Sequence, residues 1–224
     1  MERIAALALV CLCACNRPDP SLDRRVEAEL AGGWVREIAK GPPGLEGFDL
    51  RPDRSAALLG IFSMNAVAWA VSRGELVIST NTERYPQSNA SRLRILSVED
   101  GVLTLEAETR DYFAGTWHRA EVGHVDGVVT YLEHASLPPD ARVDLQLRRG
   151  GDLIARSLIA PRGPVPIPFE LSYLPEREAL EESFTIEARI VASGAPLFAT
   201  TAPLPLTLPA NDEPIEVIVR PSSP

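Results

Sequence analysis

Hydrophobic and polar residues alternate one by one over residues 143–148 and again over residues 184–190. Because successive side chains of a strand point to opposite faces, each segment predicts a half-buried antiparallel strand. The polar positions of the first segment, Asp144 among them, are expected to face water. With a hairpin turn at 150–151 and a closing strand at 215–219, about seven strands predict a two-sheet antiparallel β-sandwich.

Prolines mark one strand of this region as an edge. In the sequence PVPIPFELS, residues 164–172, the large apolar residues share one face while Pro166 and Pro168 lie on the other. Proline has no backbone N–H to donate to a neighbouring strand, so it is confined to strand edges. We therefore expect this strand at a sheet edge, protected from further pairing.

The earlier part of the chain holds eight short strand-like segments separated by turn residues. In the fourth segment Val67, Trp69 and Val71 are expected to share one face, with alanines on the other. Compact turns at 73–74 and 100–101 join neighbouring segments as hairpins. Eight strands joined in this way predict an eight-stranded up-and-down barrel or a half-open barrel. The segments begin near Trp34, Leu45, Ala56, Ala66, Glu75, Arg92, Val102 and Tyr112.

The amino-terminal end has a different pattern. Arg3 is followed by an apolar run from Ile4 to Leu12, the charged-then-apolar order of a secretory signal. About a dozen helical residues span roughly 18 Å, less than the ~30 Å hydrocarbon core of a bilayer. The run is therefore interpreted as a removed signal peptide, residues 1–14, and not as a spanning helix.

The run ends in LCAC at residues 12–15. This motif resembles the lipobox of bacterial lipoprotein precursors, which implies that Cys15 becomes the lipidated first residue, carrying acyl chains such as palmitate. By the same resemblance, Asn16 favours the outer membrane over the inner one. The alternative is an ordinary secretory signal in which Cys15 is incidental.

Four segments of the chain follow from these patterns. After the signal, residues 15–21 form a proline-containing tether, and a short helix over residues 22–31 is expected, with Ser21 as its N-cap. The expected domains are a β-barrel over 22–120 and a β-sandwich over 121–224.

Composition and charge limit the classes of partner that the chain is expected to bind. The chain carries 31 Asp and Glu against 22 Lys and Arg. It has no cluster of basic residues long enough to bind along a phosphate backbone, so nucleic acid is not an expected partner. Anionic lipids would repel such a surface, so membrane attachment is expected from acyl chains. The three cysteines, at 11, 13 and 15, all lie in or at the end of the signal, which excludes a disulfide framework in the mature chain.

The sequence contains no recognisable catalytic arrangement. His118, His124 and His134 have spacings that match no short-range metal-ligand pattern, and glutamates in the segment 173–183 are typical of a solvated loop. No nucleophile elbow, metalloprotease motif or phosphate loop is present. We therefore expect no catalytic residues, no metal site and no cofactor.

Three residues are candidates for ligand binding. The polar segment over residues 80–91 carries Asn81 and Tyr85 between two strands, and long loops at a barrel mouth often bind ligands. Trp69 is a candidate for lining a cavity in the barrel. The alternatives are a plain hairpin loop and a tryptophan packed in the core.

The stretch from Val125 to Val219 resembles the YbaY-type lipoproteins, a group related to YscW, the pilotin of type III secretion. The residues that carry the resemblance are GVVTYLEHASLPPDARVDLQL, VPIPFELSY, FTIEARI and PLFAT. It implies a small β-sandwich lipoprotein without catalytic residues, and better understood members deliver secretin subunits to the outer membrane. The first block more loosely resembles lipocalin-like barrels, through Gly-Gly-Trp at 32–34 and LRPDRSAALLGI.

Together these features predict a non-enzymatic lipoprotein anchored in the outer membrane and facing the periplasm. Its second domain is expected to bind an envelope protein such as a secretin. The alternative is a lipocalin-like carrier whose first barrel binds a small apolar ligand. A real cavity around Trp69 would favour the carrier. A hydrolase that uses scattered acids is a third, remaining possibility.

Overall fold

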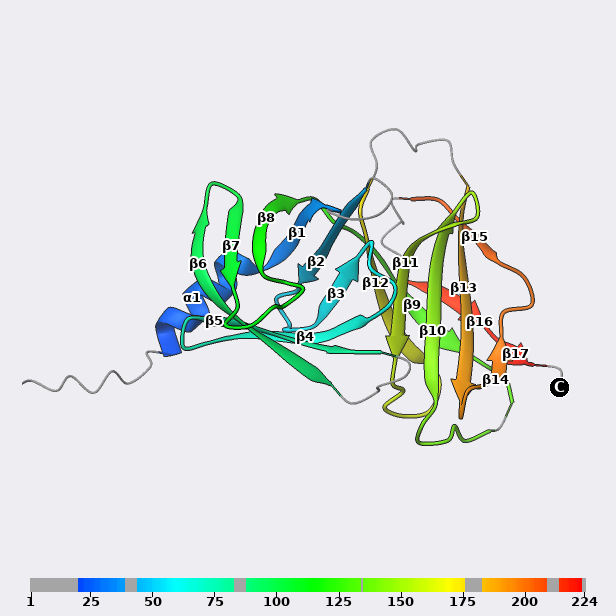
Figure 1. The fold of residues 1–224 in the computed structure, drawn as a ribbon. Coiled ribbons are helices and arrows are strands. Elements are labelled where there is room, and N and C mark those ends of the chain that lie inside the picture. The colour runs from blue at the N-terminus through cyan, green and yellow to red at the C-terminus, as the bar shows by residue number, and fades with distance from the viewer. Residues whose placement is uncertain are drawn as a thin grey trace, which may run out of the picture.

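The chain is nearly all β. In the computed structural model it forms one helix and seventeen strands within the described residues, which confirms the predicted class (Figure 1). The structure describes residues 20–38, 44–82, 88–133, 135–175, 183–208 and 214–222.

The helix α1 (Pro20–Leu30) confirms the short helix expected over residues 22–31. It begins earlier than predicted, so Ser21 lies inside its first turn and is not the N-cap. Proline suits this position because the first N–H groups of a helix have no intrahelical partner. None of the described helices has the length and apolar character needed to cross a membrane.

The first eight strands form one antiparallel sheet, as predicted. They are β1 (Gly32–Glu37), β2 (Leu45–Leu50), β3 (Ala56–Leu59), β4 (Asn65–Ser72), β5 (Glu75–Asn81), β6 (Asn89–Glu99), β7 (Val102–Glu106) and β8 (Gly115–Ala120). Their order is β3-β2-β1-β8-β7-β6-β5-β4. The two edge strands, β3 and β4, approach each other, and Trp69 N donates to Arg54 O over 2.9 Å. Because no ladder joins these edges, the sheet is a half-open barrel.

Two of the predicted hairpin turns have the backbone that such turns require. Arg73 and Gly74 have φ of 58° and 76°, and Asp100 and Gly101 have 50° and 75°. Two successive residues with positive φ match the right-handed twist of the strands they join.

The alternation predicted for β4 is interrupted. The register with β5 shifts between Ala66 and Ala68, so a β-bulge places Val67 outside while Trp69 and Val71 stay in the core. A bulge re-aims a side chain by inserting one extra residue into the strand. The prediction that Val67 shares a face with Trp69 is therefore wrong.

Large side chains occupy the interior of the first sheet. Trp34, Phe48 and Trp117 are completely buried, and the rings of Phe48 and Trp117 meet edge to face with centroids 4.7 Å apart. The helix joins this core through Leu30, whose carbonyl accepts a 2.7 Å hydrogen bond from Trp34 Nε1.

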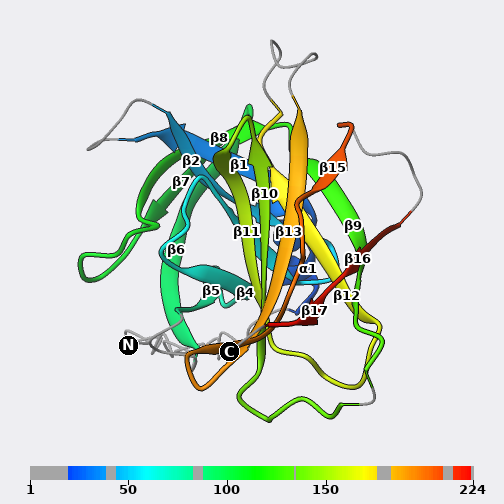
Figure 2. The same cartoon turned by 90° about the vertical axis from the view of Figure 1, so that its right-hand side faces the viewer.

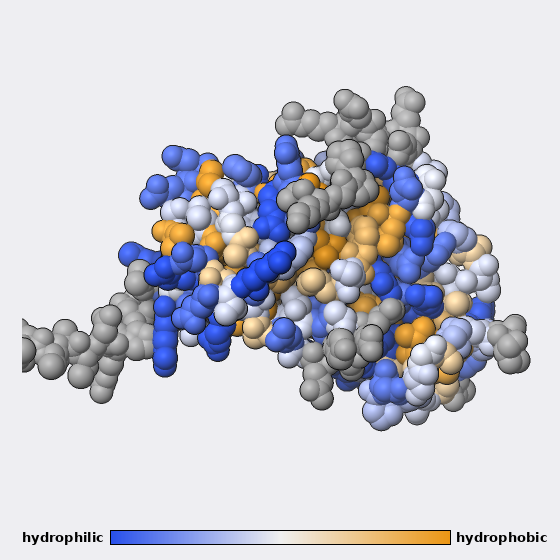
Figure 3. Space-filling view, in the orientation of Figure 1, coloured by the Kyte–Doolittle hydropathy of each residue, from blue (hydrophilic) through white to orange (hydrophobic). Residues whose placement is uncertain are grey.

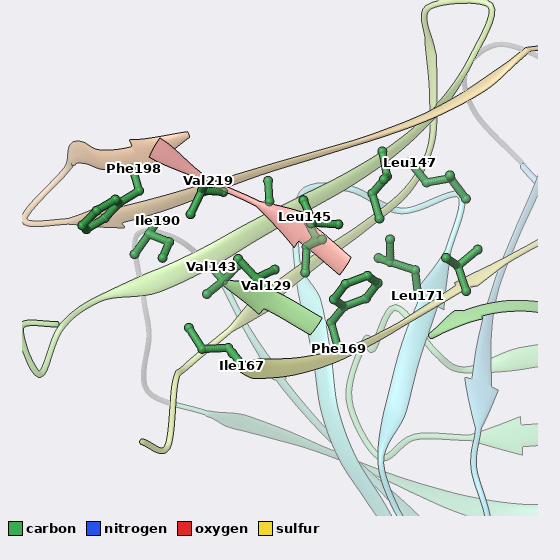
Figure 4. Packing of buried hydrophobic residues seen from close by; sticks show 14 of the residues in the cluster. Val129, Val143, Leu145, Leu147, Ile167, Phe169, Leu171, Ile190, Phe198 and Val219 are labelled. Atoms are coloured by element: carbon green, nitrogen blue, oxygen red, sulfur yellow. The ribbon is translucent and has the colours of Figure 1, made fainter. Parts of the chain in front are cut away.

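The second block is a two-sheet sandwich. Its strands are β9 (Gly123–Thr130), β10 (Arg142–Arg149), β11 (Asp152–Ile159), β12 (Ile167–Tyr173), β13 (Phe184–Ala192), β14 (Ala195–Ala199), β15 (Leu204–Leu206), β16 (Ile215–Ile218) and β17 (Arg220–Pro221). One sheet has the order β11-β10-β13-β14-β17 with β15 on β13, and the other has the order β12-β9-β16 (Figure 2). Buried side chains of the two sheets point toward one another and form the second core (Figure 4).

The sandwich differs from its prediction in three details. Beyond seven longer strands it has two short ones, β15 and β17. The closing strand β16 pairs with β9 in parallel, because side-chain alternation specifies the faces of a strand but not the direction of its neighbour. Asp144, expected to face water, is 1% exposed, because two arginine side chains from neighbouring strands cover its carboxylate.

The edge strand is confirmed. β12 lies at one end of the three-stranded sheet, and Pro168 on it is exposed. Pro166 precedes the strand, and its peptide bond with Val165 is cis.

Gly127 allows three strands to pack closely. A Cβ at this position of β9 would lie 2.1 Å from Ile215 O and 2.7 Å from Phe169 Cζ. We expect Gly127→Ala to lower the free energy of unfolding by about 1–3 kcal/mol, because the backbone of β16 must move to accept the methyl group. Urea unfolding measures the change. Gly163→Ala is the control, since a Cβ there meets no atom within 4 Å; equal losses in both variants would contradict the expectation.

The two blocks contact each other directly. Strand β3 lies beside β11 and β12, and apolar residues gather on the surface around this region (Figure 3). Asn65 Nδ2 donates to Leu158 O over 3.2 Å, and Arg156 Nη1 donates to Phe62 O over 3.3 Å. These contacts give the junction a defined geometry.

Candidate functional site

Five polar side chains from both blocks meet at the junction. We call them the junction cluster: Asp49 of β2, Arg51 just after it, His124 of β9, and Glu170 and Ser172 of β12. Strand alternation brings them together. Glu170 and Ser172 alternate with core residues of β12, and Ser172 lies opposite His124 in the register with β9. Asp49 stands between two core residues of β2, so its side chain points away from the first core.

Arg51 is the cation at the centre of the cluster. Its Nε lies 2.7 Å from Glu170 Oε1 and 3.3 Å from Asp49 Oδ2, and its Nη2 donates to Ser172 Oγ over 2.7 Å. Ser172 Oγ in turn donates to Asp49 Oδ2 over 2.7 Å. One guanidinium therefore links carboxylates from the two blocks.

His124 approaches the same carboxylates from the other side. Its Nδ1 lies 3.0 Å from Glu170 Oε1 and 3.9 Å from Asp49 Oδ2. Burial raises the pKa of Glu170; Arg51 and His124 act against this shift, and Asp126 and Asp49 add to it, so the pKa stays above its usual value. The charged form of Glu170 is therefore favoured by Arg51 and His124 and disfavoured by burial.

The cluster contains Ser, His and Asp but is not arranged as a catalytic triad. In a triad the histidine uses one nitrogen for the serine and the other for the carboxylate. Here a single nitrogen, Nδ1, faces Ser172 at 3.5 Å as well as both carboxylates, and Ser172 Oγ donates to Asp49. This arrangement holds a cation and does not activate a nucleophile.

Two cavities lie between the blocks. The junction pocket, of about 480 Å³, is lined by four members of the cluster, Asp49, Arg51, His124 and Glu170, together with residues between α1 and β1 and in the turn after β2. The junction groove, of about 780 Å³, lies between the β4 bulge and the ends of β11 and β13. Val67 and Val191 give it apolar walls, and its charged lining residues are Arg142, Arg189 and Asp140.

The structure describes two of the three predicted ligand-binding residues, Trp69 and Asn81. Trp69 is 3% exposed and packed in the first core, where its Nε1 donates to Arg51 O over 2.8 Å. Asn81 is half-buried at the end of β5 and lines the junction groove. Tyr85 and Cys15 lie outside the described residues, as does the glutamate-rich segment 176–182.

The structure describes two of the three histidines. His118 is exposed on β8, His124 belongs to the junction cluster, and His134 lies outside the described residues. The sequence analysis missed Asp49, Arg51 and Glu170. These residues are far apart in the chain, and only the alternation of Glu170 and Ser172 with apolar neighbours indicated that they face away from a core.

Residues 120–217 match a family model described as "Type III secretion system lipoprotein chaperone (YscW)". This match confirms the resemblance of the second block to YscW-type lipoproteins and spans β9 to β16. No curated protein matches the chain.

Two solved structures are similar to parts of the chain. One is an alternative pilotin from the type II secretion system of Vibrio cholerae, with 24% identity, a TM-score of 0.40, and coverage of 46% of this chain and 100% of the other. The second is a lipocalin-like protein from Bacteroides thetaiotaomicron VPI-5482, with 11% identity, a TM-score of 0.36, and coverage of 41% and 97%.

Proposed function

We propose that this protein is a lipid-anchored, non-enzymatic lipoprotein of the outer membrane that faces the periplasm and binds an envelope protein, in the manner of a pilotin. The observation that carries the proposal is the family match over residues 120–217 to a lipoprotein chaperone of type III secretion. A secretin subunit is the expected partner. The lipobox-like motif ending at Cys15 supports the anchor, and the geometry of the junction cluster supports a role without catalysis.

We further propose that residues 22–120 and 121–224 are two domains that present the partner surface together. The junction groove supports this, because its walls come from both blocks. Apolar walls with two arginines against one aspartate, Asp140, suit a segment that carries apolar and acidic side chains. Arg189 is a suitable contact, since its side chain is 49% exposed even while it pairs with Asp144.

Crosslinking in living cells tests the function. The native protein is crosslinked in place, purified and analysed by mass spectrometry, and one dominant secretin or other envelope protein is the expected result. Recovery of the anchored protein with no envelope partner would contradict the proposed function.

A negative charge placed in the junction groove tests whether the groove binds the partner. Val67 is 39% exposed at the β4 bulge, so Val67→Glu should leave the fold intact while it puts a negative charge on an apolar wall. We expect at least about a tenfold loss of crosslinked partner, since the new carboxylate replaces an apolar contact and repels the acidic side chains of the proposed partner segment. Leu96→Glu is the matched control, because Leu96 is 51% exposed on β6 and does not line the groove. Undiminished crosslinking of Val67→Glu would place the partner elsewhere.

A further inference from the structure

We propose that the junction cluster binds a divalent transition-metal ion of the Zn²⁺ class, which joins the two blocks through Asp49, His124 and Glu170. One ligand atom of each residue lies within 4.8 Å of the others. The three donors come from β2, β9 and β12, so two of them belong to the second block and one to the first. A metal ion held by all three would make the contact between the blocks depend on metal.

The distances from His124 to the two carboxylates are close to the ligand spacing of a tetrahedral site. Zn²⁺ binds nitrogen and carboxylate oxygen at about 2.0–2.2 Å, which places its ligand atoms about 3.4 Å apart. His124 Nδ1 lies 3.0 Å from Glu170 Oε1 and 3.9 Å from Asp49 Oδ2, on either side of that separation. A mixed imidazole and carboxylate set is typical of zinc and not of magnesium or calcium.

The surroundings favour a site that is accessible and held in place. Asp49 is almost completely buried, and Ser172 Oγ donates to its Oδ2 over 2.7 Å, the kind of outer hydrogen bond that orients a metal ligand. His124 and Glu170 are 39% and 33% exposed, so an ion can reach them. The junction pocket of about 480 Å³ adjoins all three donors and leaves room for water as a fourth ligand.

Arg51 is the competing cation. Its Nε occupies the space next to Glu170 Oε1 and Asp49 Oδ2, so a metal ion must displace it from both carboxylates. The guanidinium keeps two other partners, because Nη2 donates to Ser172 Oγ and Nη1 to Ser55 Oγ. Two carboxylates and a neutral imidazole then balance the charge of a dication. Removal of Arg51 should therefore strengthen metal binding. If Arg51 served only to hold the carboxylates in place, its removal would loosen the site and weaken metal binding.

Calorimetric titration with ZnCl₂ tests the proposal. The protein is the full lipidated chain, purified in detergent and without a polyhistidine tag. We expect one ion per chain, a rise in the thermal midpoint with zinc, and a weaker response to MgCl₂. His124→Gln should lower the zinc affinity at least about tenfold, because even loss of an outer-shell partner costs 10- to 100-fold. His118→Gln is the control, because His118 is exposed on β8; this variant should bind zinc as the native chain does.

Arg51→Gln provides the second, opposite readout and should raise zinc affinity. The thermal midpoint of each variant without zinc shows separately whether its fold is retained. Absence of stoichiometric zinc binding, equal binding in His124→Gln and the native chain, or weaker binding in a folded Arg51→Gln would each overturn the proposal. None of these results bears on crosslinking to an envelope partner, so the two proposals fail independently.

Discussion

Replacing Cys15 with Ser is expected to release the protein from the membrane almost completely. The proposed anchor consists of acyl chains on this residue, each buried methylene contributing about 0.8 kcal/mol, and stable attachment requires at least two chains. The chain has a formal net charge of −9, so an anionic lipid surface offers no electrostatic substitute. Serine has no thiol to carry the lipid. Membrane fractionation with immunoblotting measures the change, and mass spectrometry of the amino-terminal peptide measures lipidation.

Cys13→Ser is the matched control for this experiment. Cys13 lies two residues earlier, in the segment 1–14 that is expected to be removed, so the variant should remain attached and lipidated. Membrane attachment of Cys15→Ser equal to that of the native chain would contradict the anchor. A native chain without lipid on its amino-terminal peptide would favour the alternative in which Cys15 is incidental to an ordinary secretory signal.

Replacing Asp144 with Ala is expected to lower the free energy of unfolding by about 3–5 kcal/mol. Asp144 has a completely buried side chain; its Oδ1 accepts from Arg156 Nε and its Oδ2 from Arg189 Nε, each over 2.7 Å. Removal of one member of a buried ion pair leaves the other charge without compensation. Arg156 is affected most, because its side chain is only 17% exposed.

Urea unfolding at neutral pH measures this loss. Asp152→Ala is the control, since Asp152 is exposed at the start of β11 and its loss should change the free energy by no more than about 0.5 kcal/mol. A decrease for Asp144→Ala of the same size as in the control would show that the ion-pair network does not stabilise the fold.

The contribution of Asp144 to the free energy of unfolding is expected to decrease in acid. Burial by itself would raise the pKa of Asp144, but the hydrogen bonds and charges of Arg156, and then of Arg189, outweigh it and lower the pKa below 3.8. A carboxyl group whose pKa is lowered by folding stabilises the protein above the unfolded value and loses this contribution as pH falls through the folded value. The difference between the native chain and Asp144→Ala should therefore be full at neutral pH and shrink below about pH 4.

Much of the fold could be predicted because the relevant information is local. The hairpin turns at Arg73–Gly74 and Asp100–Gly101 depend on backbone angles that few residue pairs adopt readily. The edge position of β12 follows from prolines that lack an N–H group. Alternation over 143–148 and 184–190 marked two strands of the second core.

The same local rules failed where a strand departed from regular pairing. Alternation predicts that Val67 shares a face with Trp69, but a bulge turns Val67 toward the junction groove. Asp144 was placed in water because it alternates with apolar residues, but Arg156 and Arg189 cover it. Alternation distinguishes the two faces of a strand, and only the packing around it decides whether the second face is exposed.

The sequence by itself determined the all-β class, the eight strands of the first sheet, the main turns and the resemblance of the second block to YscW-type lipoproteins. Only the tertiary structure decided that β16 runs parallel to β9 and that Asp49, His124 and Glu170 meet at one place. Turns and alternation arise between residues a few positions apart, whereas the cluster arises from the docking of two separate β structures. No spacing along the chain encodes such a meeting, because it depends on how the outer faces of folded sheets fit together.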